Sequence, residues 1–159
     1  MSQISKKINS AYILSSFLDT LGFNNGTWEF NWNKKISSKE ESLYYQQIYY
    51  YQFFLYGGFS KYSLSDKKAS DDTILLLATT KALLNGGDKS DFIKEYIKYL
   101  PQLENPIRGS GNATIRGIKH WKKLNKDVLY DRSLGGNGAA IRTGPIGLFY
   151  HKKEDIEKL

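Results

Sequence analysis

The amino-acid sequence predicts an all-α protein, and three observations carry this prediction. Apolar side chains recur at spacings of three and four residues in several long segments, as they do on one face of a helix. Most of these segments begin at Ser or Asp and end at Gly or Pro, the usual signals of helix termini. No run of alternating polar and apolar residues is long enough to suggest a sheet. We therefore expect a single all-α domain over residues 1–159.

The first sixty residues predict two helices. Helical spacing of apolar residues starts at Ile4 and ends near Gly22, a first helix of about four turns. A second helix is expected up to Tyr56, because residues 38–41 have the form of a capping box and two glycines follow the helix. Its stretch 44–54 is aromatic almost all round, which would also fit a strand or a helix at a membrane surface. The glutamines and the caps favour a buried helix.

Four further helices are expected after residue 69, each preceded by a cap residue or a glycine turn. The last of them should break or kink at Gly144 and Pro145, because proline cannot donate the helical hydrogen bond. The end of the chain, 151–159, has the pattern of an amphipathic helix that has just begun. The expected limits are 70–86 for the third helix, 88–101 for the fourth, from 110–114 onward for the fifth and from 135–138 onward for the sixth.

Composition and charge restrict the partners. The net charge is +7, which could serve a nucleic acid or an anionic surface, but the lysines are scattered along the chain. All four arginines lie between Arg108 and Arg142, which fits a small phosphate-bearing ligand better than a nucleic acid. The absence of cysteine excludes disulfides and thiolate metal sites. Neither a secretory signal nor an apolar run of about 18 residues is present, so we expect an intracellular, cytoplasmic protein without a membrane partner.

Two short blocks suggest chemistry. Ser70-Asp71-Asp72-Thr73 places two carboxylates and hydroxyls at a helix start, where they could hold a hard cation. Residues 135–142, Gly-Gly-Asn-Gly-Ala-Ala-Ile-Arg, form a glycine-rich turn that feeds a helix, where backbone amides can cradle phosphate. Each block alone is more often structural, a helix cap in the first case and a tight turn in the second. Together they indicate a site for metal and phosphate.

With the segments Leu18-Asp19-Thr20-Leu21-Gly22 and Asn25-Gly26-Thr27-Trp28-Glu29-Phe30, the chain resembles the ADP-ribosylglycohydrolase family. The resemblance is strongest to its ADP-ribosylarginine hydrolase branch. Four family segments follow one another in the same order between residues 18 and 148: Asp-Ala-Leu-Gly, Asn-Gly-x-Trp-Glu-Phe, Ser-Asp-Asp-Thr and Gly-x-Gly-Ala-Ala-Met-Arg. The resemblance implies an orthogonal helical bundle of the family type.

It also implies a function. The expected reaction is hydrolysis of the glycosidic bond between ADP-ribose and a modified acceptor, ADP-ribosylarginine on protein, with two Mg²⁺ ions in the site. By resemblance, Ser70, Asp71 and Asp72 are metal ligands, and Glu29, Asp71 and Asp72 are catalytic. Asp19 orients a metal ligand. The ADP-ribose would lie against residues 135–139, which are Gly135, Gly136, Asn137, Gly138 and Ala139.

Two departures from the family pattern shape the alternatives. Leu18 stands where the family has glycine, which would crowd the pocket. Family members are longer and take further metal ligands from an Asp-rich segment near the C-terminus, so this chain is interpreted as the N-terminal portion of the family domain with half of the metal ligands. The alternatives are a half-enzyme completed by a second chain or by a homo-oligomer, and an inactive ADP-ribose-binding remnant. A third, weaker alternative is a basic nucleic-acid-binding helical module.

Overall fold

The computed structural model describes residues 3–32, 34–126, 132, 135–136 and 138–150. Within these ranges every regular element is a helix and no strand occurs, which confirms the all-α prediction. Three short 3₁₀ turns connect the helices: η1 (Asn24–Gly26), η2 (Gly58–Ser60) and η3 (Pro106–Arg108). The helices are α1 (Gln3–Phe23), α2 (Lys39–Leu55), α3 (Asp71–Asn85), α4 (Lys89–Leu103), α5 (Asn112–Leu124), α6 (Gly138–Ile141) and α7 (Gly144–Phe149).

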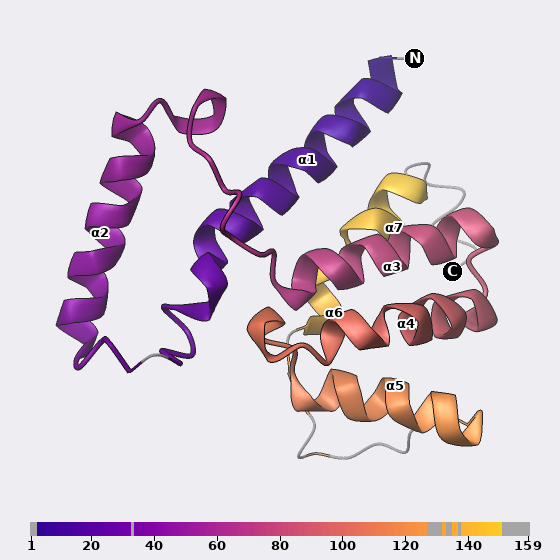
Figure 1. Ribbon diagram of the computed structural model, residues 1–159. Coiled ribbons are helices and arrows are strands. Elements are labelled where there is room, and N and C mark those ends of the chain that lie inside the picture. Colours follow the sequence, from indigo (N-terminus) through magenta and orange to yellow (C-terminus); the bar gives the residue numbers. More distant parts are fainter. Residues whose placement is uncertain (1–2, 33, 127–131, 133–134, 137, 151–159) are drawn as a thin grey trace.

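The helices form two groups on either side of α1 (Figure 1). On one side α3, α4 and α5 lie side by side, and the short helices α6 and α7 pack against α3. On the other side α2 stands apart, connected to α3 by a long loop. The C-terminal part of α1 lies between the groups and contacts α3. The positions of the site residues therefore depend on how α1 meets α3.

Three of the expected helix starts are confirmed by their caps. A side-chain oxygen at the N-cap satisfies one of the backbone N–H groups that the first turn leaves without a helical partner. The second, third and fourth helices end within two residues of their predicted limits. In each of the three, the cap accepts a hydrogen bond from the backbone two or three residues on: Ser38 from Glu41, Ser70 from Asp72 and Asp88 from Asp91.

The structure corrects two boundaries. The first helix is 21 residues long, so the estimate of four turns was too short. The fourth helix passes through Pro101 and ends at Leu103, which is 1% exposed; burial of Leu103 offsets the hydrogen bond that proline cannot make. The sixth predicted helix is interrupted before Gly144 and becomes α6 and α7, as expected. The helix predicted over 151–159 lies outside the described residues.

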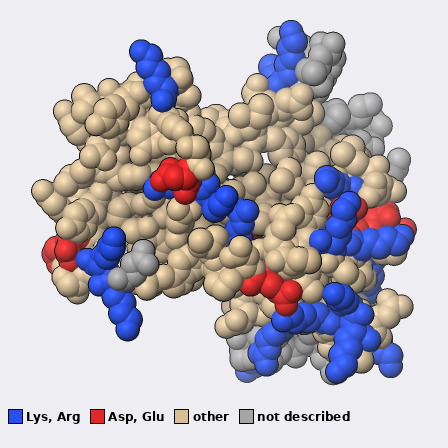
Figure 2. All heavy atoms as spheres, viewed as in Figure 1, with Lys and Arg blue, Asp and Glu red and all other residues tan. Residues whose placement is uncertain are grey.

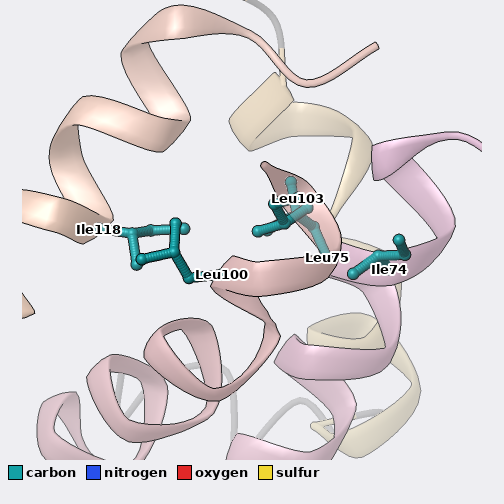
Figure 3. Packing of buried hydrophobic residues seen from close by; sticks show 5 residues of the cluster. All are labelled: Ile74, Leu75, Leu100, Leu103 and Ile118. Carbon is teal, nitrogen blue, oxygen red and sulfur yellow. The ribbon is translucent and has the colours of Figure 1, made fainter. Parts of the chain in front are cut away.

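An aliphatic cluster forms the core of the α3–α5 group, and Figure 3 shows its side chains converging from three helices. It consists of Ile74 and Leu75 from α3, Leu100 and Leu103 from α4, and Ile118 from α5, and each is at most 4% exposed. Tyr96, Ile97, Tyr99 and Ile115 cover its edges. Burial of this apolar surface holds α3 rigidly, and α3 carries the two carboxylates of the candidate site.

The second cluster is aromatic and joins α1 to α2. Leu21, Tyr49 and Phe53 are buried in it, and Phe17 and Trp28 pack against them. The rings meet edge to face or tilted, for example Trp28 and Tyr49 with centroids 5.8 Å apart. The prediction of a buried α2 is largely wrong. Only one edge of the helix is covered, while Phe54 remains 72% exposed and Tyr51 68% exposed.

Basic side chains are distributed over several elements in Figure 2 and are densest over α5, whose last turn carries Lys122 and Lys123. In the described part of the chain, no helix combines the length and the apolar character needed to cross a membrane.

Candidate active site

A cleft of about 730 Å³ opens where α1, α3, α5 and α6 approach one another. Its size lies in the range of small-molecule sites. Most of the residues predicted from the sequence line this cleft: Asp19, Glu29, Ser70, Asp71, Asp72, Gly135, Gly136 and Gly138. Asn137 lies outside the described residues, and Ala139, in the first turn of α6, is not part of the lining. Leu18 lines the cleft as well and is 46% exposed.

Asp19 joins α1 to the start of α3. One carboxylate oxygen accepts hydrogen bonds from the backbone N–H of Ser70 at 2.9 Å and from the hydroxyl of Thr73 at 2.6 Å. The other accepts the hydroxyl proton of Ser70 at 2.7 Å. Hydrogen bonds to a charged acceptor are about twice as strong as neutral ones. Asp19 therefore sets both the position of Ser70 and the direction of its hydroxyl.

The buried hydroxyl of Ser70 has one unused acceptor position. The hydroxyl donates a hydrogen bond to Asp19, and one of its lone pairs accepts the backbone N–H of Asp72 at 3.1 Å. A hydroxyl oxygen has two lone pairs, so the second is available to a ligand in the cleft. The carbonyl of Ala69 just before it is held by the guanidinium of Arg108 at 2.6 Å. The start of α3 is thus fixed from α1 and from η3.

Asp71 and Asp72 concentrate negative charge in the cleft. Partial burial raises the pKa of Asp71 to about 6, with a further contribution from the neighbouring charge of Asp72. Burial, followed by the charge of Asp19, also raises the pKa of Asp72. The guanidinium of Arg142 opposes both shifts. Carboxyl groups whose ionised forms are destabilised in this way are favourable places for a cation to bind.

The oxygen ligands at the start of α3 are of the type that a hard cation prefers, but they are too few to fill its coordination shell. Ser70, Asp71 and Asp72 all offer oxygen, the ligand that Mg²⁺ prefers. Among the residues that the structure describes, no group of three or more His, Cys, Asp or Glu side chains is placed to hold a metal. These residues can therefore supply part of an octahedral shell, with water or a bound ligand completing it.

The glycine-rich wall is attached through Arg142. Its Nε donates to the carbonyl of Gly138 at 2.7 Å, and Nη2 reaches the Thr114 hydroxyl at 3.5 Å, so the side chain connects α6 to the first turn of α5. The guanidinium also lies 5.9 Å from the ring centre of Tyr96. Apart from Gly136 itself and its chain neighbours, no atom of the described residues lies within 4 Å of a Cβ built on Gly136, which leaves room for a ligand on this side.

Glu29 is exposed at the cleft and belongs to a loop held by aromatic side chains. On one side of it, Trp28 packs on Tyr49 of α2. On the other side, Phe30 covers Gly109, where a Cβ would lie only 2.7 Å from the ring. A side chain larger than hydrogen at Gly109 would push the Glu29 loop away from the cleft.

A third wall of the cleft was not predicted from the sequence. It is formed by the start of α5, where Gly111, Asn112, Ala113 and Thr114 line the cleft. The sequence pattern indicated only that this segment precedes a helix. A signal was present, because a glycine and small polar residues before a helix leave room for a ligand near free backbone N–H groups. The positions of Arg108 and Arg142 in the sequence favoured a phosphate-bearing ligand, but they did not indicate that the two side chains bind the carbonyls of Ala69 and Gly138.

The helical fold and the cleft define an all-α protein with acidic and glycine-rich walls facing one ligand space. The family model for ADP-ribosylglycohydrolase matches residues 11–159, and the chain belongs to this family. The match covers all three walls of the cleft.

Two curated relatives show how much of the family domain is present. The chain is 34% identical over 155 residues to protein L444 of Acanthamoeba polyphaga mimivirus, named as a candidate ADP-ribosyl glycohydrolase; the match covers 91% of this chain and 29% of L444. It is 29% identical over 172 residues to ADP-ribosylhydrolase ARH1 of Dictyostelium discoideum, covering 100% of this chain and 41% of that protein. The chain thus spans less than half the length of these relatives. No solved structure matches it significantly.

Proposed function

We propose that this chain contributes to an Mg²⁺-dependent hydrolase that cleaves the bond between ADP-ribose and an acceptor, arginine on a protein. One observation carries the proposal: segments far apart in the sequence place acidic, hydroxyl and glycine residues on the walls of one cleft. Membership of the ADP-ribosylglycohydrolase family supports the ADP-ribosyl group as the substrate. The arginine acceptor rests on the resemblance of the sequence segments to that branch.

In this proposal the metal side of the cleft is the start of α3. The free lone pair of Ser70 and the carboxylates of Asp71 and Asp72 would hold Mg²⁺, with Asp19 keeping the Ser70 hydroxyl oriented. A bound Mg²⁺ would supply positive charge that orients ribose hydroxyls and water. It would also stabilise the ionised form of Asp71, whose pKa is raised by burial and then by the charge of Asp72.

The glycine-rich wall would take the diphosphate. Gly135 and Gly136 carry no side chain into the cleft, so a phosphate can approach their backbone N–H groups. The guanidinium of Arg142 adds a fixed positive charge to the same region.

Glu29 would act on the reacting end of the substrate. Glycosidic cleavage develops positive charge on the ribose, and carboxylates at the bond stabilise that charge or transfer a proton. Glu29 is exposed at the cleft, and the loop that carries it is fixed at Trp28 and Phe30. In this proposal Glu29 acts on the bound sugar from a loop that is already in place.

A second candidate is a chain that binds ADP-ribose without turnover, alone or until another chain completes it. The incomplete donor set within the described residues favours this candidate. The two candidates differ in one observable. Both predict Mg²⁺-assisted binding of ADP-ribose, and only the first predicts release of ADP-ribose from ADP-ribosylarginine by this chain.

The test combines calorimetry and turnover. ADP-ribose should bind more tightly with Mg²⁺ than without it, and D71N/D72N should remove that difference, because an amide oxygen cannot neutralise the cation. Asp66→Asn is the matched control, since this exposed acid lies outside the cleft. Equal affinity with and without Mg²⁺ in the parent chain would overturn the metal assignment.

A second pair of variants tests the glycine wall. Gly136 has open space at its Cβ position, so both Ala and Asp fit sterically. Gly136→Asp places a negative charge beside the phosphates and should weaken ADP-ribose at least tenfold, about 1.4 kcal/mol, whereas Gly136→Ala should leave binding nearly unchanged. If the two variants bind alike, the diphosphate lies elsewhere.

A further inference from the structure

A second cavity of about 390 Å³ adjoins the candidate active site. The two share Gly109 and Asn112 in their linings. The second cavity is lined on one side by the rings of Phe30 and Trp32, which follow Glu29 in the chain. The second cavity therefore adjoins the cleft that Glu29 lines, and its two rings come from the same loop as Glu29.

Two aromatic rings form an exposed platform in this cavity. Phe30 and Trp32 are stacked, with centroids 4.8 Å apart and planes 6° from parallel. Phe30 remains 37% exposed and Trp32 43% exposed. Large exposed aromatic side chains are typical of binding surfaces, because they offer much contact area at a small cost in conformational entropy.

The two rings of the platform pack against η1 and α1. A Cβ on Gly26 would lie 2.6 Å from the Trp32 ring, so the ring packs directly on the backbone of η1. Phe23 meets both rings edge to face, with centroids 6.4 Å away in each case. The rings are thus fixed against α1 and η1 while part of their surface stays open.

Asn31, which lies between the two ring residues in the chain, is bound to Ile36. The side-chain amide of Asn31 donates to the carbonyl of Ile36 at 2.7 Å and accepts the N–H of Ile36 at 3.2 Å. Asn31 has a φ of 43°, a left-handed conformation that asparagine tolerates better than most residues. This pair of hydrogen bonds fixes Asn31, and with it the chain between the two rings, before a ligand binds.

The cavity also holds a polar group without a partner. The hydroxyl oxygen of Ser110 is buried and has no hydrogen-bond partner among the described residues, and Ser110 lines the same cavity. Glu104 and Lys119 form an ion pair at 2.6 Å elsewhere in the lining. An unpaired buried hydroxyl costs free energy, which a ligand that hydrogen-bonds to it would recover.

We propose that this cavity, here called the acceptor cavity, binds the polypeptide segment that carries the ADP-ribosyl group. The inference rests on the proposed function. The first cleft is large enough for ADP-ribose, so the neighbouring space beside Glu29 is available to the acceptor. A peptide offers backbone groups to Ser110 and a planar or cationic side chain, such as arginine, to the face of the platform.

The test compares two ligands on the full chain in the presence of Mg²⁺: free ADP-ribose, and an arginine peptide that carries ADP-ribose through a linkage that cannot be hydrolysed. Calorimetry gives both affinities. The peptide should bind the parent chain about tenfold more tightly than ADP-ribose, as expected for one stacking contact and one hydrogen bond. Trp32→Ala should remove most of this gain and leave the affinity for ADP-ribose unchanged. Trp32→Phe, which keeps an aromatic face, should retain most of it.

Two further variants guard against misfolding and unspecific effects. Ser110→Ala removes a hydroxyl that has no partner, so it should leave stability unchanged or raised and should weaken the peptide alone. Tyr51→Ala is the matched control, because Tyr51 is an exposed aromatic residue on α2 outside both cavities. It should change neither affinity.

The outcomes are distinct. If Trp32→Ala weakens both ligands equally, the platform holds part of ADP-ribose itself, and the acceptor proposal is wrong. If the peptide binds the parent no more tightly than ADP-ribose does, the proposal is wrong while the proposed function stands. A parent chain that binds neither ligand would overturn the proposed function together with this inference.

Discussion

The two hydrophobic clusters of this protein are built from different side chains and are closed to different degrees. The α3–α5 cluster is aliphatic, and Leu75 at its centre is fully buried. The α1–α2 cluster is aromatic, and α2 covers it with one edge while Phe54 and Leu55 remain exposed. Branched aliphatic side chains from three helices can interdigitate to native density, whereas one helix edge laid on another cannot enclose large rings.

The candidate site lies where α1 and the loop after it meet the α3–α5 group, an interface here called the seam. Asp71 and Asp72 belong to the closed group, and Asp19 and Glu29 come from α1 and the loop that follows it. Asp19 crosses the seam through hydrogen bonds to Ser70 and Thr73. The comparison indicates that the α3–α5 group provides rigidity, while the α1 side sets how the acidic groups meet.

The largest effect is expected in the closed cluster. Leu75→Ala should lower the free energy of unfolding by about 3–5 kcal/mol, because it leaves a cavity where neighbouring side chains cannot relax fully. Urea denaturation followed by circular dichroism measures this. A loss below about 1 kcal/mol would show that the cluster rearranges and is not the rigid part of the fold.

The second largest loss of stability is expected at the seam between α1 and the start of α3. Asp19→Ala leaves the N–H of Ser70 and the hydroxyls of Ser70 and Thr73 without their acceptor, so we expect a loss of about 2 kcal/mol. Mg²⁺ binding should weaken as well, since the Ser70 hydroxyl is then free to rotate. Thermal unfolding with and without Mg²⁺ measures both effects. Unchanged stability would mean that water replaces the carboxylate and that α1 does not hold α3.

Removing the charge of one of the paired carboxylates should raise the stability of the fold, in contrast to the two preceding variants. The folded pKa of Asp71 is about 6, above its unfolded value near 3.8, so the folded state binds more protons between these values. Stability should therefore fall as pH rises from about 4 to 6. Because Asp71 is only partly buried, Asp71→Asn should raise stability at pH 7 by about 1 kcal/mol after allowance for solvent screening.

The same variant provides its own control at acid pH and with metal. Near pH 3, below both pKa values, the parent and Asp71→Asn should be equally stable, because Asp71 is then largely protonated in the folded and in the unfolded parent. Saturating Mg²⁺ at pH 7 should reduce the advantage of the variant, since the parent, which keeps both carboxylates, gains more from cation binding. If the variant is less stable than the parent at pH 7 without metal, the charge of Asp71 stabilises the fold and our interpretation of the cleft is wrong.

The smallest effect is expected on the open face of α2. Phe54→Ala should change the free energy of unfolding by no more than about 0.5 kcal/mol in the isolated chain, because the ring is 72% exposed. Denaturation at two protein concentrations, with sedimentation velocity beside it, is the measurement. A concentration-dependent loss of more than 1 kcal/mol would show that the face is covered by a second copy and that the cluster is not open.

Local signals predicted the helix starts well. Ser38, Ser70 and Asp88 each accept the backbone N–H that a cap should accept, because capping depends on residues only two or three positions apart. Pro101 shows the limit of such rules. The helix continues past it because Leu103 finds its place in the α3–α5 cluster, a contact that no local pattern reveals.

The candidate site shows the same division. The order and residue types of the short motifs predicted which side chains meet, and Asp19, Glu29, residues 70–72 and the glycine turn line one cleft. The start of α5, the two arginine anchors and the Phe30–Trp32 platform were not predicted. They depend on chain segments that are distant in sequence, whose packing is not encoded in any single motif.

The sequence by itself determined the all-α class, the helix starts and the family segments, because helix caps, apolar spacing and motifs are properties of neighbouring residues. Only the tertiary structure decided that α2 leaves most of its rings exposed, that Asp19 turns the Ser70 hydroxyl, and that Asp71 has a raised pKa. Exposure, hydrogen-bond direction and desolvation are set by which surfaces the folded chain brings together, and each changes with the distance between groups far apart in sequence.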